Sequence, residues 1–568
     1  MSTVLTDNLP LLAGAPNGIK KLRELILELA VRGKLVPQDP SDEPASELLK
    51  RIAEEKARLV AEGKIKKAKA TQEELAEVSY EIPSSWAVAA LGQVVEIVRG
   101  ITFPASEKSK EPESGRVACL RTANVQDEIE WDDLLYIRES FVSRNDQYVE
   151  PHDIVMSMAN SRELVGKVAL IGSELKKKTT FGGFLGVLRP VLIEPRFVMA
   201  LLRTPHARSI LIDSASQTTN IANVSLAKLR PLPFAIPPLA EQHRIVAKVD
   251  ELMALCNRLE ARQADADSAH AQLVQALLSS LTQASDAEDF AQSWQRLAEH
   301  FHTLFTTESS IDALKQTLLQ LAVMGKLVPQ DPSDEPASEL LKRIAEEKTR
   351  LISEEGLRTT ARDDVPEAEH YFRLHTGWAS CRLGNLARFI DYRGRTPTKT
   401  SSGVPLITAK NVRPGFISRD PQEFIADTDY LSWMTRGFPR VGDMLFTTEA
   451  PMGNVAIIDI AERFALAQRV ICFQLHELET GPFLKLALMS SGFQAQLSDA
   501  ATGMTATGIK SSRLKEIPVP IPPLAEQHRI VAKVDELMAL CDQLKARLNQ
   551  ARQVHEHLAS ALVEQAVA

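Results

Sequence analysis

The chain has 568 residues, and nowhere do 18 apolar residues run together. A helix needs ~20 mostly apolar residues to cross a bilayer, so we expect no transmembrane segment. The N-terminal residues carry no positively charged segment ahead of an apolar core, so we expect no secretory signal. The five cysteines are far apart, and none lies in a CxxC pair or a Cys/His cluster with zinc-site spacing. This usage is typical of a reducing cytoplasm and predicts no structural metal.

Motifs that carry catalysis are also missing. We find no Walker A sequence, no GxGxxG, no HExxH, no GxSxG and no Asn-Pro-Pro-aromatic tetrapeptide of amino-methyltransferases. Nor do acidic residues precede a lysine in the pattern of a metal-dependent nuclease. We therefore expect no catalytic residue and no metal site in this chain.

The net charge of −8 is unevenly distributed along the chain. Residues 80–235 hold 18 basic and 18 acidic residues, and residues 371–520 hold 17 basic and 13 acidic residues. The acidity therefore lies in the remaining segments. Because a ligand responds to the field within a Debye length, ~8–10 Å at physiological salt, nucleic acid stays open as a partner.

What the sequence does have is a duplication. Block A reads GKLVPQDPSDEPASELLKRIAEEK at residues 33–56 and again at 325–348. Block B reads IPPLAEQHRIVAKVDELMALC at residues 236–256 and again at 521–541. The chain thus runs A, variable, B and then A, variable, B. One frame with two divergent inserts indicates one operation performed on two different targets.

The frame is predicted to be helical. No proline or glycine interrupts residues 239–281, and a helix of that length would span ~65 Å. Apolar residues recur at the four-three spacing of a coiled-coil seam. We expect the two long helices to pack antiparallel within one chain. The seam residues are Ile245, Val249, Leu252, Cys256, Leu259, Ala266, His270, Leu273 and Leu277, and in the second copy Ile530, Val534, Leu537, Cys541, Leu544, Leu548, Ala551, His555, Leu558 and Leu562.

The inserts open alike, with Trp86 before Leu91-Gly92 and Trp378 before Leu383-Gly384. Each continues with apolar strand-like runs broken by turns, and each ends in a proline-marked strand that leads into the long helix. We therefore predict an α+β fold class, with two similar β-rich domains separated by antiparallel coiled-coil helices in an internal pseudo-twofold repeat. The expected domains are an N-terminal helical repeat (1–79), a first insert (80–235), a central helical scaffold (236–370), a second insert (371–520) and a C-terminal helix (521–568).

The layout resembles the specificity subunit of type I restriction-modification enzymes over almost the whole chain. The residues that carry the resemblance are Trp86–Gly92, TTNIANVSLAKLRPLPFAIPPLAEQHRIV (218–246) and ATGIKSSRLKEIPVPIPPLAEQHRIV (506–531). The resemblance implies that each insert is a target-recognition domain that reads one half of a split, asymmetric double-stranded DNA site. It also implies that the helices dock two modification subunits, which bind S-adenosylmethionine and methylate adenine. Motor-nuclease restriction subunits would use ATP and Mg²⁺, and this chain would bind no cofactor.

Candidate DNA-binding residues are those that can pair with base edges or phosphates. In the first insert they are Arg99, Arg121, Asn124, Arg162 and Lys167, with Lys176, Lys177 and Lys178 as phosphate contacts. In the second they are Arg393, Arg395, Thr396, Lys399, Lys410, Asn411 and Arg413. The subunit-contact scaffold is predicted to include Glu241, Gln242, Ile245, Val249, Leu252, Glu526, Gln527, Ile530, Val534 and Leu537.

Two other functions stay open on the sequence alone. The chain could be a self-contained enzyme with two related active sites, which methylase or nuclease activity of the purified chain would reveal. It could also be a coiled-coil scaffold whose inserts bind protein, which failure to bind any DNA would favour.

Overall fold

A computed structural model describes residues 9–66, 78, 80–162, 164–175, 177–214, 216–217, 222–355, 365–370, 372–392, 397–502 and 508–567. They form two compact units, the first comprising residues up to 265 together with those from 551 onward, and the second residues 266–550. None of the helices in the described part of the chain combines the length and the apolar character that a membrane span requires.

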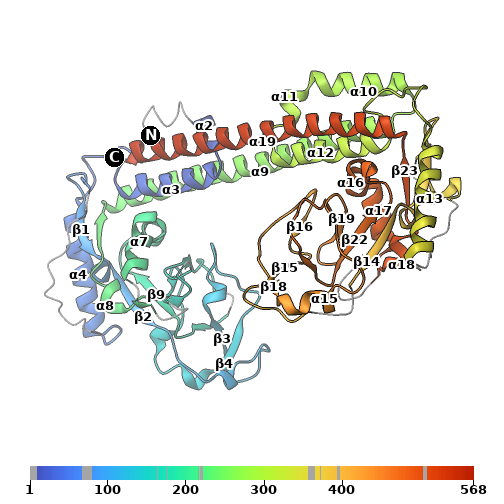
Figure 1. Ribbon diagram of the computed structural model, residues 1–568. Helices are drawn as coiled ribbons and strands as arrows, with labels where there is room; N and C mark the ends of the chain where they lie inside the picture. Colours follow the sequence, from blue (N-terminus) through green and yellow to red (C-terminus); the bar gives the residue numbers. More distant parts are fainter. Residues whose placement is uncertain are drawn as a thin grey trace. The chain divides into compact units, whose positions relative to one another are not determined.

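The first unit is drawn mainly in blue to green in Figure 1. Its elements in chain order are α2 (Leu9–Gly14), α3 (Gly18–Val31), α4 (Ala45–Ala61), β1 (Ala87–Ala90), α5 (Leu91–Val94), β2 (Val95–Arg99), β3 (Arg116–Leu120), β4 (Leu135–Arg138), β5 (Ile154–Ser157), β6 (Ala159–Asn160), β7 (Val168–Leu170), β8 (Thr179–Phe181), β9 (Leu185–Pro190), α6 (Pro195–Arg203), α7 (Pro205–Ser214), β10 (Ser216–Gln217), β11 (Ala222–Asn223), α8 (Leu226–Leu229), β12 (Pro233–Ile236) and the long helix α9 (Leu239–Gln283), which continues into the second unit.

The second unit repeats this order. Its elements are α10 (Ala287–Glu299), α11 (Phe301–Leu304), α12 (Glu308–Val323), α13 (Ala337–Glu355), β13 (Ala379–Arg382), α14 (Leu383–Leu386), β14 (Ala387–Asp391), β15 (Val404–Ile407), β16 (Val412–Arg413), β17 (Phe416–Ile417), β18 (Phe424–Ile425), α15 (Tyr430–Trp433), β19 (Met444–Thr448), β20 (Met452–Ile457), β21 (Ala465–Leu466), β22 (Val470–Leu475), α16 (Gly481–Met489), α17 (Ser491–Ala500), α18 (Ser511–Leu514), β23 (Pro518–Ile521) and the long helix α19 (Leu524–Val567), which ends in the first unit.

The two inserts share the strand order of their two larger sheets and differ in a small third one, β10-β11-β6 in the first and β16-β17 in the second. The first holds a four-stranded sheet in the order β2-β9-β5-β7 and a three-stranded sheet in the order β4-β3-β8, and the second holds β14-β22-β19-β20 and β18-β15-β21. In both, a short antiparallel pair closes the domain beside the long helix, β1 with β12 and β13 with β23. The predicted pair of α+β domains on one skeleton is therefore confirmed.

The core of each insert lies on both faces of its four-stranded sheet. Ile154 and Met156 of β5 pack toward the helices, while Val155 between them packs toward the three-stranded sheet. The same division separates Phe446 from Leu445 in β19. Because side chains alternate along a strand, burial on both faces requires continuous apolar runs.

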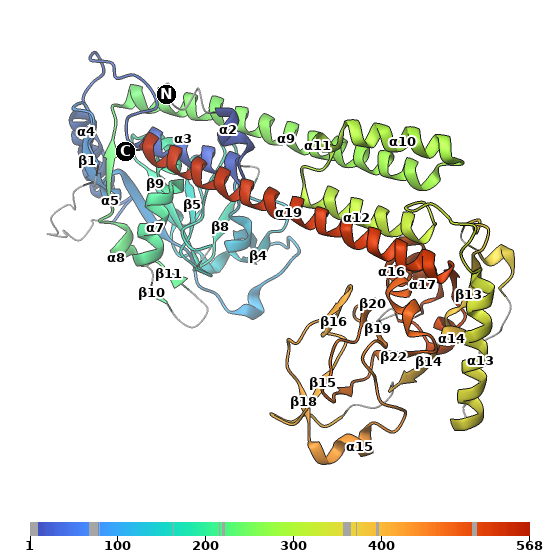
Figure 2. The ribbon, with the colours of Figure 1, turned by 45° about the horizontal axis from the view of Figure 1, so that its top comes forward.

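Each unit contains the start of one long helix and the end of the other, together with one helix that precedes a copy of block A. In the first unit, Lys21 of α3 donates to Ser560 Oγ of α19 at 2.8 Å, and Arg23 donates to Glu260 of α9 at 2.6 Å. Figures 1 and 2 both show α3 alongside α9 and the last turns of α19. In the second unit, Lys545 of α19 pairs with Asp312 of α12 at 3.0 Å. Start-to-end pairing is what two antiparallel helices require.

The predicted seam holds for only the first part of each helix. Ile245, Val249, Leu252 and Cys256 are buried, but Leu273 is 53% exposed and Val274 is 3% exposed. The second copy does the same, since Leu558 is 43% exposed and Ala559 is fully buried. The predicted register is therefore wrong at the exposed positions Ala266, Leu273, Ala551, His555 and Leu558, whereas Leu277 and Leu562 are partly buried against the cores. A straight helix drifts ~20° per heptad from a 3.5-residue repeat, so after about four heptads the next residue takes the seam position.

Candidate nucleic-acid interface

Each insert is fastened to its long helix by a buried tryptophan and a buried glutamate. Trp86 Nε1 donates to Glu241 Oε2 at 3.0 Å across 155 residues of sequence. Gln38 of block A donates to the other carboxylate oxygen, Oε1, at 2.8 Å. Burial raises the pKa of the Glu241 carboxyl, while the two hydrogen bonds that it accepts act in the opposite direction. The anchor joins block A, the insert and block B at one point.

The same anchor recurs in the second unit. Trp378 Nε1 donates to Glu526 Oε2 at 3.0 Å, and Gln330 donates to Glu526 Oε1 at 3.2 Å. Both inserts are therefore attached to the frame by the same hydrogen bonds. Because the glutamine comes from block A and the glutamate from block B, each attachment requires a copy of both blocks.

The residues predicted as a subunit-contact scaffold act inside this chain. Gln242 donates to the Pro237 carbonyl and accepts from the Glu194 backbone, and Gln527 donates to the Pro522 carbonyl. The apolar members pack in the cores; they are Ile245, Val249, Leu252, Ile530, Val534 and Leu537. Leu537 is partly buried, and each of the others is at most 9% exposed. Side chains buried in this way cannot also face another subunit, so a partner would meet the exposed residues beside them.

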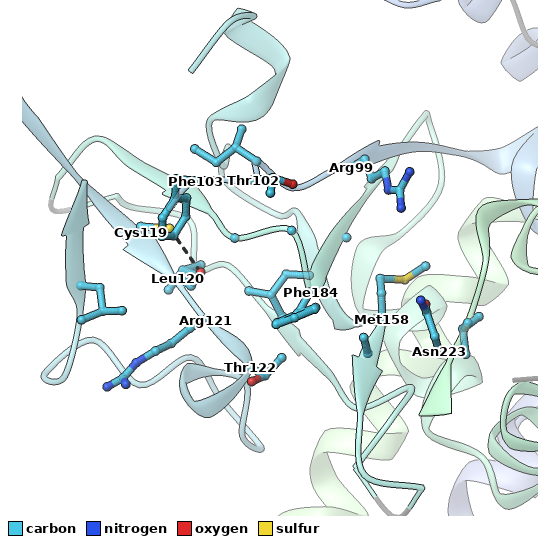
Figure 3. A pocket seen from close by; sticks show the side chains of 18 of the residues that line it. Arg99, Thr102, Phe103, Cys119, Leu120, Arg121, Thr122, Met158, Phe184 and Asn223 are labelled. Atoms are coloured by element: carbon cyan, nitrogen blue, oxygen red, sulfur yellow. Dashed lines mark hydrogen bonds between the residues drawn. The ribbon is translucent and has the colours of Figure 1, made fainter. Parts of the chain in front are cut away.

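A cleft of about 670 Å³ opens in the first insert where its loops meet. Two of the predicted DNA-binding residues line it, Arg99 at the end of β2 and Arg121 after β3. Phe184, between β8 and β9, lies in the middle of the cleft, with Arg121 and Thr122 to one side and Met158 and Asn223 to the other (Figure 3). Arg121 also forms an ion pair with Asp133.

Asn124 and Asn411 hold equivalent turns and are both 1% exposed. Asn124 Oδ1 accepts from the Arg121 backbone at 3.0 Å, and its Nδ2 donates to the Glu130 and Asp133 carbonyls. Asn411 Oδ1 accepts from the Thr408 backbone at 3.0 Å, and its Nδ2 donates to the Ser418 and Pro421 carbonyls. These amides shape the loops that follow β3 and β15, whereas their predicted contact with bases would require those hydrogen bonds to open.

The other candidates of the first insert lie on its surface. Arg162 is exposed, and Lys167 donates to Gln126. Lys177 lies over the ring of Tyr136 at 5.7 Å from its centroid. Lys178 lies 4.1 Å from the ring centroid of Tyr148 and donates to Glu139 at 2.6 Å, a bond that raises the pKa of Lys178. Lys176 lies outside the described residues.

In the second insert the described candidates lie on either side of β15, Lys399 before it and Lys410, Asn411 and Arg413 after it. Lys399 pairs with Glu423 at 2.7 Å, and Lys410 and Arg413 are exposed beside the turn that Asn411 holds. Arg393, Arg395 and Thr396 lie outside the described residues. Contact with DNA stays a prediction for all candidates in both inserts.

Two loop residues that the sequence reasoning missed occupy matching places in the two inserts. The Phe184 carbonyl accepts from the Met158 backbone at 2.9 Å, and the Arg469 carbonyl accepts from the Thr448 backbone at 2.9 Å. The first is aromatic and the second cationic, so no shared sequence pattern marks the position. The strand register alone identifies it.

Comparison with known proteins follows the same division into two domains. The family described as "Type I restriction modification DNA specificity domain" matches residues 83–266 and 376–552. The Type I restriction enzyme EcoAI specificity subunit of Escherichia coli is 38% identical, with 97% of this chain and 94% of that protein covered. The EcoEI specificity subunit of Escherichia coli is 36% identical with the same coverage. Among solved structures, the HsdS subunit from Thermoanaerobacter tengcongensis matches 86% of this chain and 98% of its own at 18% identity and a TM-score of 0.39. With both inserts matched and nearly the whole length shared, the chain belongs to the family of type I restriction-modification specificity subunits.

Proposed function

We propose that this chain is the DNA-reading subunit of a type I restriction-modification complex and works in the cytoplasm. The observation that carries the proposal is one frame that fastens two domains of the same topology through the same Trp–Glu–Gln anchor, while the loops of those domains differ. Two different loop surfaces on one chain suit a bipartite site whose halves are unrelated in sequence. The chain itself is non-catalytic.

The first insert meets DNA through the loops around the cleft that Arg99 and Arg121 line. Arginine can pair with base edges in the major groove, while phosphate contacts fix position and supply most of the salt-dependent affinity. In the second insert the exposed Lys410, just before β16, and Arg413, its last residue, make these contacts with DNA. Asn124 and Asn411 act by shaping the loops.

The duplicated helices dock two copies of one modification subunit. The exposed face of block B is the same in both copies: Lys248 pairs with Glu251 at 2.8 Å, and Lys533 pairs with Glu536 at 3.0 Å. Leu255 and Leu540, at equivalent positions, are 36% and 54% exposed. Equal surfaces select equal partners. S-adenosylmethionine would be bound by these modification subunits, and ATP with Mg²⁺ by the restriction subunits.

The decisive experiment is to sequence the methylated adenines in DNA from a host that carries the complete system. We expect a single bipartite, asymmetric motif, with one methylated adenine in each half. Methylase or nuclease activity of the isolated chain would instead favour a self-contained enzyme. Failure to bind DNA even with modification subunits present would favour a protein-binding scaffold.

The lysine cluster is tested by salt dependence. Replacing Lys176, Lys177 and Lys178 with alanine should weaken binding to specific and nonspecific duplexes alike, because phosphates are the same in every sequence. Each lost phosphate contact should flatten the slope of log K against log salt by ~0.9. Lys50→Ala with Lys342→Ala, equivalent exposed lysines of α4 and α13 that pair with Glu47 and Glu339, is the matched control and should leave the slope unchanged. An unchanged slope in the cluster variant would show that its charges serve only Glu139 and the neighbouring tyrosines.

A further inference from the structure

We infer that Phe184 and Arg469 are equivalent specificity-determining residues, with Phe184 contacting a thymine methyl group in one half-site and Arg469 a guanine in the other. The inference rests on the proposed function and names where, within each insert, a single base pair is read.

The equivalence of the two positions follows from strand register. In the first insert, Ser157 of β5 lies opposite Leu185 of β9, and in the second, Thr447 of β19 lies opposite Val470 of β22. One residue further out, the backbone bonds from Met158 to Phe184 and from Thr448 to Arg469 close the same ring at 2.9 Å.

A third segment confirms the match. Val224 donates its backbone N–H to the Met158 carbonyl at 2.9 Å, and Ile509 donates to the Thr448 carbonyl at 3.0 Å. Phe184 and Arg469 therefore occupy equivalent backbone positions, next to two paired strands and a third segment that bonds to them. What differs between them is the side chain.

Phe184 is more exposed than an aromatic side chain that only stabilises the fold would be. Its side chain is 64% exposed, in a cleft that Arg99 and Arg121 also line (Figure 3). Lys108 is a third cation of the cleft lining. A phenyl ring cannot bind a phosphate, although the cations around it suit one. The apolar group that a DNA groove offers such a ring is the thymine methyl, which projects into the major groove.

Arg469 has a strained backbone, with φ at 76°, in the left-handed region that glycine usually occupies. Strain of this kind is stored mainly at functional sites, where a particular side chain is required. Arg469 Nε lies 2.5 Å from Glu449 Oε1. The residue of the first insert equivalent to Glu449 is Ala159, which follows Met158 as Glu449 follows Thr448. A carboxylate that orients a guanidinium prepares it for a bidentate contact with guanine O6 and N7.

The test uses the full chain assembled with its modification subunits, and its readout is the sequence motif of the methylated adenines. Phe184→Ala should relax a required thymine at one position of one half-site. Arg469→Ala should relax a required guanine at one position of the other half-site. The preference for the original base pair should fall by roughly 5- to 150-fold, the usual effect of one mismatch.

A gain of preference provides the second arm. Phe184→Arg combined with Ala159→Glu copies the second insert's pair into the first, and it should replace the thymine requirement with one for guanine. The controls are Leu192→Ala, another exposed apolar residue of the first insert, and Arg463→Ala, which pairs with Asp427 on the surface of the second. Both controls should leave the motif unchanged.

Three results would overturn the inference while leaving the proposed function intact. In each of them the unmodified protein methylates a bipartite motif. The Phe184 and Arg469 variants then either keep that motif unchanged, weaken methylation of all sequences equally, or alter both halves of the motif together. A uniform loss for Phe184→Ala would mean a wedge between base steps, and for Arg469→Ala a phosphate contact. A parent that methylates no bipartite motif would instead refute the proposed function, and this inference with it.

Discussion

At the scale of single residues, chemistry suited to DNA and chemistry that holds the fold lie side by side. Asn124 has the donors and acceptors to pair with adenine, yet its amide is buried and bonded to three backbone groups. Glu241 is fully buried and bonds Trp86 and Gln38. The side chains in position to meet a ligand are those at strand ends and in the loops beyond them, such as Arg99 and Phe184.

The anchor makes a prediction about stability. Glu241→Ala leaves the buried indole N–H of Trp86 without its acceptor and removes one hydrogen bond of the exposed Gln38, so we expect a loss of about 1–3 kcal/mol in the free energy of unfolding. Urea denaturation would measure it. Glu251→Ala, an exposed residue of the same helix that pairs with Lys248, is the control and should have little effect. Equal losses for the two variants would contradict the role of the anchor.

His476 predicts a pH dependence. Burial, with the nearby Lys348 and Arg440 outweighing Glu347, lowers the pKa of His476 from 6.5 to about 4. The folded state therefore keeps the imidazole neutral, whereas the unfolded chain takes up a proton below its ordinary pKa. Stability should fall as the pH drops from 6.5 toward 4. His476→Gln should show a shallower fall in unfolding temperature over this window, and an identical slope would contradict the assignment.

At the scale of elements, the long helices show how a repeat is modified by geometry. Large apolar residues are absent from residues 260–269, all of which are exposed. The helix therefore re-enters the core in a new register, with Val274 in place of Leu273. The second long helix shows the same one-residue shift, with Ala559 buried in place of Leu558, so the shift is a property of both copies of the helix.

This register is tested by neighbouring substitutions. Val274→Ala removes buried methyl groups and should lower the free energy of unfolding by about 1–2 kcal/mol. Leu273→Ala, one position away and 53% exposed, should change it by no more than about 0.5 kcal/mol. Denaturant titration of both variants provides the comparison. A larger loss for Leu273→Ala than for Val274→Ala would instead support the uninterrupted heptad register, with Leu273 in the seam.

At the scale of the whole molecule, reading and spacing are separate tasks. Each insert has its own sheets and one core of its own between them, and its other core is shared with the helices of the frame. The Trp–Glu–Gln anchor and one short strand pair fix the insert to the start of the long helix. Specificity should follow the insert, and the gap between half-sites should follow the helices.

Exchange of the second insert, residues 371–520, for that of a related specificity subunit should change one half of the methylated motif. The other half and the gap should stay the same, because the frame is untouched. One added turn in each long helix, ~5.4 Å, should lengthen the tolerated gap by about 1.6 base pairs without altering either half. Motif sequencing would show both effects, and a swap that altered both halves would refute modular reading.

Sequence patterns alone predict the duplicated frame, the two long helices and the pair of similar inserts. Repeats, proline-free apolar periodicity and turn residues are local signals, and local signals can be read along a chain. Features that depend on residues far apart in the chain follow from the folded arrangement: the pairing of Trp86 with Glu241, the burial of Asn124 and Asn411, and the burial of Val274 in place of Leu273. The folded arrangement also places Phe184 and Arg469 at one shared position, because that match depends on which backbone groups meet across strands. Periodicity predicts the elements of this protein, whereas strand register and packing select the side chains that reach its ligand.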